Sequence, residues 1–311
     1  MKRESKRNQN TAKNPAWNEQ RSEQISIQWF PGHMAKTRRR ITEDLKLVDV
    51  VAEILDARIP QSSSNPVLRD IIQSKPRIVL LNKSDMADPV KTSRWVTSYG
   101  EKGLKAIPLD CKTGKGIPAF YAGIREILQE RIAAWEQKGM VGRPIRIMVV
   151  GIPNVGKSSL INRLVKAGGK AEVQDKPGVT RQNHWFTVGK GFELLDTPGV
   201  LWPKFEDPTV GEHLAFTGAV KDEILDREGL ACRLLLLLMQ LYPDAINARY
   251  KLDIRPEDGL QGYEILESIG RKRGMLISGG EVDAERAANT VLDEYRGGLL
   301  GRITLELPEE R

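Results

Sequence analysis

Hydrophobic positions in the first two thirds of the chain fall alternately into short runs and into helical spacings. Apolar runs bounded by turn residues predict buried strands, and apolar positions three and four apart predict amphipathic helices. The predicted strands cover residues 50–55, 78–81, 106–109, 145–150 and 192–195. The predicted helices cover residues 34–47, 117–132 and 159–165. This alternation predicts an α/β fold with a mainly parallel sheet covered by helices on both faces.

The pattern changes towards both ends of the chain. After about residue 208 strands nearly vanish, residues 230–242 are apolar almost all round, and residues 284–295 are apolar at helical spacing. Such segments are typical of a small helical bundle. We therefore predict three parts: a mobile basic tail over residues 1–26, an α/β domain over residues 27–208, and a small all-α domain over residues 209–311.

The composition of the 311 residues narrows the class of protein. A hydrophobic content of 40% excludes wholesale disorder. The longest apolar run, residues 234–239, is far shorter than the roughly 18 residues of a membrane span. Cys111 and Cys232 make neither a disulfide framework nor a zinc site. The tail has no apolar secretion signal, so we expect a cytoplasmic protein with no membrane partner.

The net charge of +7 is unevenly distributed. Residues 1–46 have a balance of +6, residues 47–208 of +7, and residues 209–311 of −6. This asymmetry is typical of a protein with a polyanionic partner such as nucleic acid, although Lys and Arg that merely solubilise a surface explain it equally well. In the acidic last part, RNA contact would depend on basic islands such as residues 249–255 or 271–273, which could equally be solvated helix ends.

Residues 151–158, GIPNVGKS, fit a phosphate-binding loop. They follow a predicted strand and open a predicted helix, where backbone N–H groups and the helix N-terminus cradle phosphate oxygens. Lys157 would reach the β- and γ-phosphates, and Ser158 would bind magnesium. The alternative is an ordinary glycine-rich turn. The predicted phosphate-contacting residues are Asn154, Val155, Gly156, Lys157, Ser158 and Ser159.

Two further segments are consistent with a nucleotide-phosphate site at this loop. Asp196 ends a predicted strand in the sequence Asp-Thr-Pro-Gly, where its carboxylate would hold the magnesium shell and the Gly199 N–H would contact the γ-phosphate. Thr180 lies between the two segments, where a mobile threonine binds magnesium only while the γ-phosphate is present. We therefore predict magnesium ligands at Ser158, Asp196 and Thr180.

A guanine site is predicted at the sequence Asn82-Lys83-Ser84-Asp85, directly after a strand. The Asp85 carboxylate can accept hydrogen bonds from N1–H and the exocyclic amine of guanine, whereas adenine would leave it unpaired. Asn82 would brace the loop and the stem of Lys83 would lie on the base. The alternative is a polar turn after a strand.

A second loop that touches the base is predicted after the next strand. Residues 110–114 resemble the Ser-Ala-Lys loop whose backbone contacts guanine in GTPases, with Asp110 and Cys111 in place of Ser-Ala. Cys111 and Lys112 are therefore predicted to bind the nucleotide. The base motifs precede the phosphate motifs along the chain, which is the reverse of the usual order. A circularly permuted GTPase domain, joined through residues 139–144, explains this order.

Two further motifs identify a family. The sequence Trp-Phe-Pro-Gly-His-Met over residues 29–34 and the sequence Asp-Ala-Arg-Ile-Pro over residues 56–60 complete the pattern. Over residues 26–300 the chain resembles the RbgA (YlqF) family of bacterial ribosome-assembly GTPases and their mitochondrial relatives. The resemblance implies binding to the maturing large ribosomal subunit, its rRNA and its ribosomal proteins, and an RNA-contacting helical domain. We expect a monomer away from the ribosome.

The hydrolytic group is not evident from the motifs. Val200 stands where many GTPases have the glutamine that orients water, and a hydrocarbon cannot do this. The resemblance implies the class with a hydrophobic residue there. His33 is a candidate catalytic residue, with a cap or packing residue at the helix start as the alternative; His184 is interpreted as structural, and His213 has no assigned role. Lys157, Thr180 and Gly199 complete the predicted catalytic set.

Asn154 lies where potassium-stimulated GTPases place a ligand for the monovalent ion, although it could simply tolerate a tight loop. The predicted substrate is GTP, with magnesium and, at Asn154, potassium as cofactors. We predict a GTP hydrolase that acts as a switch in late assembly of the large subunit and is stimulated by it. A GTP-gated RNA-binding scaffold is the alternative, while an ATP-using kinase disagrees with Asp85.

Overall fold

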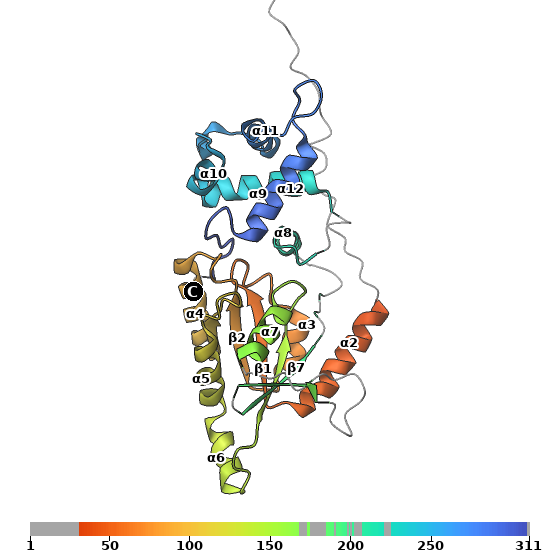
Figure 1. The fold of residues 1–311 in the computed structure, drawn as a ribbon, viewed down its shortest axis with the longest axis vertical. Helices are drawn as coiled ribbons and strands as arrows, with labels where there is room; N and C mark the ends of the chain where they lie inside the picture. Colours follow the sequence, from red (N-terminus) through yellow and green to blue (C-terminus); the bar gives the residue numbers. More distant parts are fainter. Residues whose placement is uncertain are drawn as a thin grey trace, which may run out of the picture.

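The computed structural model describes residues 31–167, 173–174, 185–189, 191–197, 199, 201, 207–220 and 225–309, with side chains from residue 36 onward. Figure 1 shows a part built around a sheet and, beyond its edge, a part built from helices. The chain passes from the first to the second near residue 207.

Seven strands form one sheet in the order β3-β2-β1-β4-β7-β6-β5. Their pairing is parallel from β3 to β7, whereas β6 runs antiparallel to both β7 and β5, so the predicted mainly parallel sheet is confirmed. All seven residues of β1 are buried, as expected of a central strand covered on both faces. The strands are β1 Val50–Asp56, β2 Arg77–Asn82, β3 Lys105–Pro108, β4 Ile145–Val150, β5 Val173–Gln174, β6 Trp185–Val188 and β7 Phe192–Asp196.

Helices cover the two faces of the sheet. Helices α5 (Ile117–Ile127) and α7 (Lys157–Ala167) pack on one face, and α2 (Pro31–Asp44), α3 (Pro66–Ile72) and α4 (Pro89–Glu101) on the other. Because side chains alternate along a strand, successive residues of β1 enter opposite cores: Val50 and Ala52 join the first, and Val51 joins the second. The single turn η1 (Leu45–Leu47) leads from α2 into β1.

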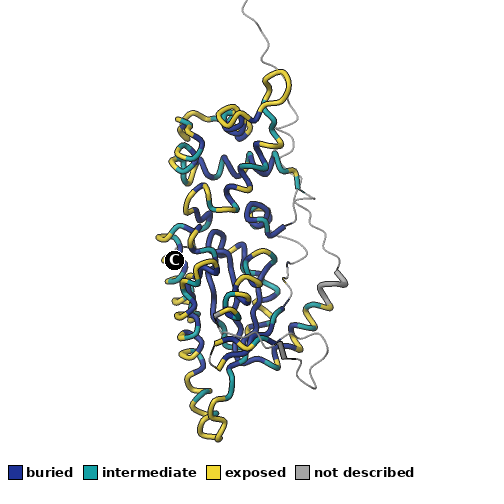
Figure 2. The backbone as a smooth tube through the Cα atoms, in the orientation of Figure 1, coloured by how far each residue is buried: buried dark blue, intermediate teal, exposed yellow. Residues whose placement is uncertain are grey.

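The helix predicted over residues 117–132 is interrupted. Helix α5 ends at Ile127 and α6 (Gln129–Gln137) begins after Leu128, whose backbone angles of −101° and 10° leave the helical range. The packing of the two helices differs: α5 buries residues against the sheet, whereas no residue of α6 is fully buried and only Ile132 and Trp135 pack, half-buried, against the core. Helix α6 projects beyond the sheet and is largely exposed (Figures 1 and 2).

The helical part is arranged around α9. Helices α11 and α12 pack against α9, and the apolar core continues from the sheet through Leu201 and α8 into this part. Outside helices, an isolated bridge joins Leu276 to Val282. The elements are α8 Pro208–Phe216, α9 Arg227–Leu241, α10 Pro243–Tyr250, the single turn η3 Pro256–Asp258, α11 Gly262–Lys272 and α12 Ala284–Gly297.

Within the described residues, no single helix is long and apolar enough to cross a membrane. The pair α9 and α10 passes that test together, but the two helices are bent by 116°.

Candidate nucleotide-binding site

Three loops with predicted chemistry and the segment that carries the second family motif lie at one edge of the sheet. Residues 56–60 follow β1, residues 82–85 follow β2, residues 110–114 follow β3, and residues 151–158 follow β4. The four strands are adjacent and parallel, so their carboxyl ends meet at the same edge. In open α/β sheets this edge is where ligands bind.

Asn82 ties the predicted base loops to the predicted phosphate loop. Its Nδ2 donates to the carbonyl of Val155 at 2.7 Å, and its Oδ1 accepts from the N–H of Cys111 at 3.4 Å. Gly156 adopts a φ of +106°, and a Cβ there would collide with the Asn82 amide. A buried side chain therefore fixes three loops, from β2, β3 and β4, against one another.

The loop after β2 forms a tight turn. Lys83 has a φ of +60°, the Met86 N–H donates to the carbonyl of Lys83 at 2.9 Å, and the Ser84 N–H donates to the carbonyl of Leu109 at 3.1 Å. This turn leaves Asp85 exposed, where its carboxylate can meet a ligand. The ammonium of Lys83 instead pairs with the Asp56 carboxylate at 2.9 Å.

The loop after β3 is closed by Asp110, the residue that departs from the Ser-Ala-Lys pattern. Its carboxylate accepts from the Lys112 N–H at 2.7 Å and from the Thr113 hydroxyl at 2.5 Å. Burial opposes ionisation of this carboxyl, but these hydrogen bonds outweigh it and lower the pKa of Asp110. The Cys111 thiol is buried, which raises its pKa to about 12 and leaves it neutral.

Lys157 is a buried cation without a carboxylate in hydrogen-bond contact among the described residues. Its Nζ donates to the carbonyls of Ile152 at 2.8 Å and Gly151 at 3.2 Å. Burial lowers its pKa to about 8, only partly opposed by the charge of Asp196. A Cβ on Gly199 would lie 2.7 Å from this Nζ, so the two predicted phosphate-contacting residues are adjacent. An anion such as a phosphate oxygen would compensate the buried charge.

The residues predicted to hold magnesium are only partly placed. Ser158 is exposed in the first turn of α7, and Asp196 ends β7, in register with Val149 of β4. The Thr197 hydroxyl next to it donates to the carbonyl of Val149 at 2.6 Å, which fixes the end of β7 against β4. Thr180 lies outside the described residues. A hydroxyl and a carboxylate are suitable oxygen donors for magnesium.

Asn154 joins the phosphate loop to the helical part. It adopts a φ of +57°, and its Nδ2 donates to the carbonyl of Gly218, just after α8, at 2.6 Å. The side chain is exposed. Of the other predicted phosphate residues, Val155 is buried and Ser159 is exposed on α7.

A buried charge cluster after β1 joins the base loop to α12. The Arg58 guanidinium pairs with the Asp56 carboxylate at 2.8 Å, donates to the carbonyl of Tyr295 at 3.1 Å, and lies 5.2 Å from the centre of that ring. Burial opposes ionisation of Asp56, but Arg58 and Lys83 hold its pKa well below the usual range. The sequence indicated residues 56–60 only as a family motif and did not predict that they join the base loop to α12. The charged residues directly after a buried strand were a signal that could have indicated this role.

The three histidines are distributed as follows. His213 is buried, and its Nδ1 lies 2.8 Å from the Glu306 carboxylate and 3.2 Å from the Ser62 hydroxyl. His213 thus joins α8 to Glu306 and Ser62, a contact that the sequence did not indicate. His184, Val200 and the side chain of His33 lie outside the described residues.

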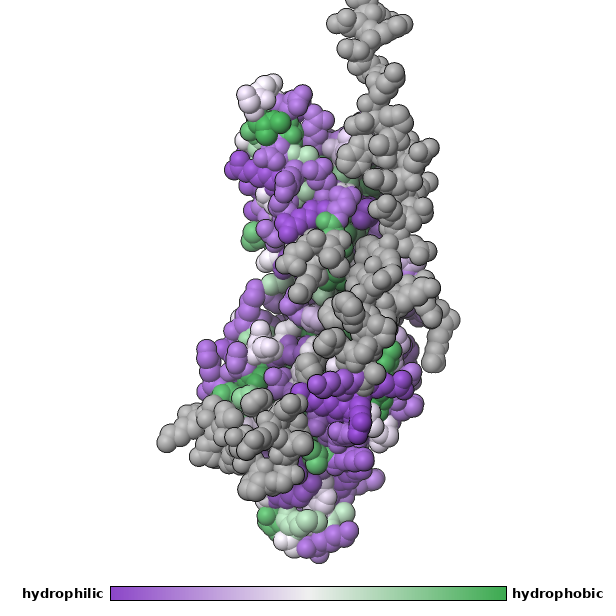
Figure 3. Space-filling model, turned by 90° about the vertical axis from the view of Figure 1, so that its right-hand side faces the viewer, coloured by the Kyte–Doolittle hydropathy of each residue, from purple (hydrophilic) through white to green (hydrophobic). Residues whose placement is uncertain are grey.

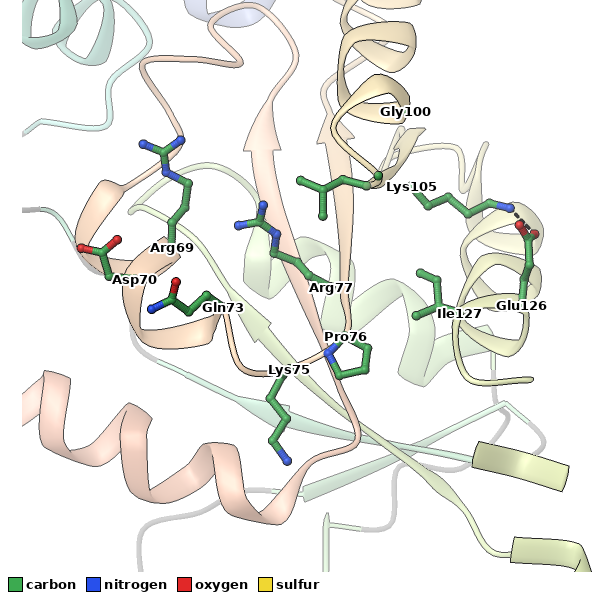
Figure 4. Close-up of a pocket in the computed structure, with 12 residues that line it drawn as sticks. Arg69, Asp70, Gln73, Lys75, Pro76, Arg77, Gly100, Lys105, Glu126 and Ile127 are labelled. Atoms are coloured by element: carbon green, nitrogen blue, oxygen red, sulfur yellow. Dashed lines mark hydrogen bonds and ion pairs between the residues drawn. The ribbon is translucent and has the colours of Figure 1, made fainter. Parts of the chain in front are cut away.

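A cavity of about 850 Å³ lies at the opposite edge of the sheet, near the amino ends of β2 and β3 (Figure 4). Three of its four cations are already engaged: Arg77 pairs with Glu53 at 3.2 Å, Lys105 pairs with Glu126, and Lys75 donates to a backbone carbonyl. It contains none of the predicted nucleotide residues, so the loops at the carboxyl edge remain the candidate site.

The sequence is similar to proteins of one family along almost its whole length. A protein called ribosome biogenesis GTPase A from Priestia megaterium is 51% identical over 287 residues, which cover 92% of this chain and 98% of the relative. The chain belongs to the ribosome biogenesis GTPase A family. A mouse protein called mitochondrial ribosome-associated GTPase 1 is 34% identical, with 89% of each chain covered. A family profile described as a 50S ribosome-binding GTPase matches residues 146–263.

Solved structures of ribosome biogenesis GTPase A relatives have the same fold. The GDP-bound YlqF of Thermotoga maritima is 27% identical, has a TM-score of 0.62, and covers 88% of this chain and 100% of its own. Its GNP-bound form covers 89% of this chain and 100% of its own, with a TM-score of 0.61. The predicted circularly permuted GTPase fold and family are therefore confirmed. As a member of this family, the chain is an enzyme that hydrolyses GTP.

Proposed function

We propose that the chain is a GTP-dependent switch in late assembly of the large ribosomal subunit, with hydrolysis stimulated by the subunit. The names of the relatives and of the matching family support a ribosomal partner. The observation that carries the nucleotide chemistry is the bridging by Asn82, which joins both base loops to the phosphate loop despite their permuted order.

In the proposed site each loop has one task. The Asp85 carboxylate recognises the guanine edge, and the stretch from Cys111 to Lys112 supports the base. Residues 154–159 hold the phosphates through backbone N–H groups at the start of α7, and the buried Lys157 faces the β- and γ-phosphates. Ser158, Asp196 and Thr180 would hold magnesium, which neutralises charge on the phosphates.

Hydrolysis is proposed to be slow without the subunit. Val200 cannot orient water, so the missing group is supplied or ordered by the partner, with His33 as the candidate from this chain. Lys157 stabilises charge on the transferring phosphoryl group, while Thr180 and Gly199 respond to the γ-phosphate. Asn154 is proposed to ligate potassium through Oδ1, since its Nδ2 is already used toward Gly218.

The proposed RNA contacts lie on the basic first part. In α2, Arg38 is exposed, whereas Arg39 pairs with Glu43 at 3.0 Å and Arg40 with Asp44 at 3.7 Å. Hydrophilic side chains cover the face that α2 crosses (Figure 3).

Basic residues of the helical part are less available. Arg249 and Arg273 both pair with Glu294, at 2.6 and 3.5 Å, and Arg271 pairs with Glu267 at 2.7 Å. We therefore favour the first part for RNA contact, because its positive charge is less compensated.

The test is GTP turnover in potassium buffer with and without purified large ribosomal subunits. We expect a rise of about tenfold or more, since the subunit completes a site that Val200 leaves incomplete. Small subunits serve as the control partner. No rise, with GTP-dependent binding to the large subunit intact, would instead support an RNA-binding scaffold. Equal rates in sodium and potassium buffers would reject the role of Asn154 in potassium binding.

Base recognition has its own test. Excess ATP should leave GTP binding unchanged, because adenine cannot pair with the Asp85 carboxylate. The variant Asp85→Asn should bind GDP more weakly and xanthosine diphosphate more tightly, because xanthine has a carbonyl where guanine has its amine. A variant with unchanged preference would show that Asp85 does not read the base.

A further inference from the structure

A segment from the far end of the sequence lies against the base loop. Residues 299–307, here the C-terminal strap, leave α12 and return to the carboxyl edge of the sheet beside α4, where the C-terminus is marked in Figure 1. The strap begins with a close approach: Gly298 has a φ of +77°, and a Cβ there would lie 2.8 Å from Cγ of Met86. Ile303, Thr304 and Leu305 of the strap are buried.

Backbone hydrogen bonds tie the strap to two predicted loops. The Ile303 N–H donates to the carbonyl of Met86 at 2.9 Å, and the Leu305 N–H donates to the carbonyl of Arg58 at 2.8 Å. Thr304 adds two more bonds, since its hydroxyl donates to the carbonyl of Ala57 at 3.2 Å and accepts from the Asp88 N–H at 3.1 Å.

Arg302 spans the turn that contains Asp85. Its Nη2 donates to the carbonyl of Ser84 at 3.0 Å, and its Nε donates to the carbonyl of Ala87 at 3.0 Å. The backbone N–H of Ile303 adds the bond to the carbonyl of Met86. The Arg302 side chain and this N–H together bond the carbonyls of three residues around Asp85, namely Ser84, Met86 and Ala87. The strap therefore supports the backbone of the base loop, in addition to the bond from Ser84 to Leu109.

We propose that the C-terminal strap is a specificity element of the guanine site, and that Arg302 is a positioning residue for Asp85. This inference rests on the proposed role of Asp85 in base recognition. The strap does not touch the base in this assignment; it fixes the turn so that the carboxylate meets the exocyclic amine. Discrimination by a carboxylate requires that its position be held closely, and a loop bonded on one side only would not hold it.

The experiment compares the dissociation constants of GDP and inosine diphosphate, whose base lacks that amine. In the wild-type protein the dissociation constant for inosine diphosphate should be about tenfold larger than that for GDP, as expected when one hydrogen bond to a charged group is lost. In Arg302→Ala, GDP should bind roughly tenfold more weakly, and the ratio of the two constants should fall by at least about threefold. Arg302→Lys, which keeps the charge but replaces the fixed fork of the guanidinium by a single ammonium, should show an intermediate ratio.

The control variant is Arg286→Ala, which removes an exposed arginine from the first turn of α12 and should leave both constants unchanged. Thermal unfolding of each variant without nucleotide separates folding from positioning. A lower melting temperature with an unchanged ratio of constants would overturn the proposal and leave Arg302 a purely structural residue. A wild-type protein that does not discriminate between the two nucleotides would instead contradict the role of Asp85, independently of the strap.

Discussion

At the scale of single residues, the two side chains that organise the site act through backbone groups. Asn82 bonds a carbonyl of the phosphate loop and an N–H of the second base loop, and Lys157 bonds carbonyls of its own loop. The sequence predicted where both residues lie along the chain and that Asn82 braces a loop. It could not predict that Asn82 meets Val155 and Cys111, because these two residues follow strands distant from it in sequence. Nor could it show that Lys83 pairs with Asp56, since that contact depends on the β1–β2 register.

The bridge made by Asn82 leads to a prediction for Asn82→Ala. The substitution removes the bond to Val155 and leaves the buried Cys111 N–H unpaired, so the free energy of unfolding should fall by about 1–3 kcal/mol. GDP affinity should fall by about tenfold, because the loops lose their common alignment. Denaturant unfolding and titration with a fluorescent GDP measure the two effects.

The matched control is Asn65→Ala. Asn65 is equally buried but caps α3, away from the four loops, so its loss should cost about 1 kcal/mol of stability and leave GDP affinity unchanged. Equal effects of the two substitutions on GDP affinity would contradict the bridging role.

The buried Lys157 predicts proton uptake on nucleotide binding. Its pKa is lowered to about 8 in the free protein, and a neighbouring phosphate should raise it toward the ordinary value. Binding of GDP at pH 8.5 should therefore take up a proton from the buffer, whereas binding at pH 6.5 should not, because the lysine is already charged there. Calorimetry in buffers of different ionisation enthalpy measures this uptake. Guanosine, which has no phosphate, is the control ligand, and equal uptake with it would contradict the assignment.

At the scale of elements, local sequence signals predicted some strands and helices, whereas others were missed or depended on tertiary packing. Strands β1, β2, β4 and β7 were predictable because each is a mainly apolar run bounded by turn residues. Helices α3 and α4 were missed, although Asn65-Pro66 and Asp88-Pro89 are N-cap and first-turn pairs that mark helix starts. The break between α5 and α6 was not predictable from spacing, because apolar positions continue at helical spacing to Ile132, which still packs against the core.

The ion pair between Asp56 and Arg58 lies at the end of β1, and Arg58 also donates to the carbonyl of Tyr295 near the end of α12. It therefore links these two elements. Asp56→Asn should lower the free energy of unfolding by about 3–5 kcal/mol, since the buried Arg58 loses its counter-charge. The wild-type protein should also lose stability as the pH falls below about 4, because the depressed pKa of Asp56 gives stability that is present only above the pKa of the unfolded chain.

Urea unfolding at neutral and acidic pH measures both effects. Asp70→Asn, at an exposed position on α3, should change stability by less than about 0.5 kcal/mol. An Asp56→Asn variant whose stability follows the same pH dependence as the wild type would contradict this explanation.

At the scale of the whole molecule, the helical part contacts the loops of the nucleotide site at several places, including the bond from Arg58 to Tyr295, and two of these places lie at loops that meet different parts of a nucleotide. The strap holds it to the base loop, and Gly218 after α8 holds it to Asn154 of the phosphate loop. GTP and GDP have the same base, so the base loop contacts the same group in both states. The phosphate loop contacts three phosphates in one state and two in the other. We therefore expect the nucleotide state to act on the α8 contact and to leave the strap unchanged.

Hydrogen exchange can test this asymmetry. Amides of α8 should exchange at different rates with GDP and with a non-hydrolysable GTP analogue, whereas those of Ile303 and Leu305 should not. Helix α11, which packs on α9 away from both links, provides the internal reference. Equal exchange throughout α8 in the two states would contradict coupling between the nucleotide and the helical part.

The permuted order of the loops also has a consequence for biosynthesis. Ser84 and Arg302 are 218 residues apart, so the base loop is translated long before the segment that braces it. During synthesis the nascent chain holds a sheet edge with the loops of β1 to β3 and no phosphate loop, and later a phosphate loop with an unbraced base loop. On the proposed role of the strap, full guanine selectivity is acquired only once Arg302 has been translated, and a chain truncated within α12 should hold phosphate but discriminate poorly between bases.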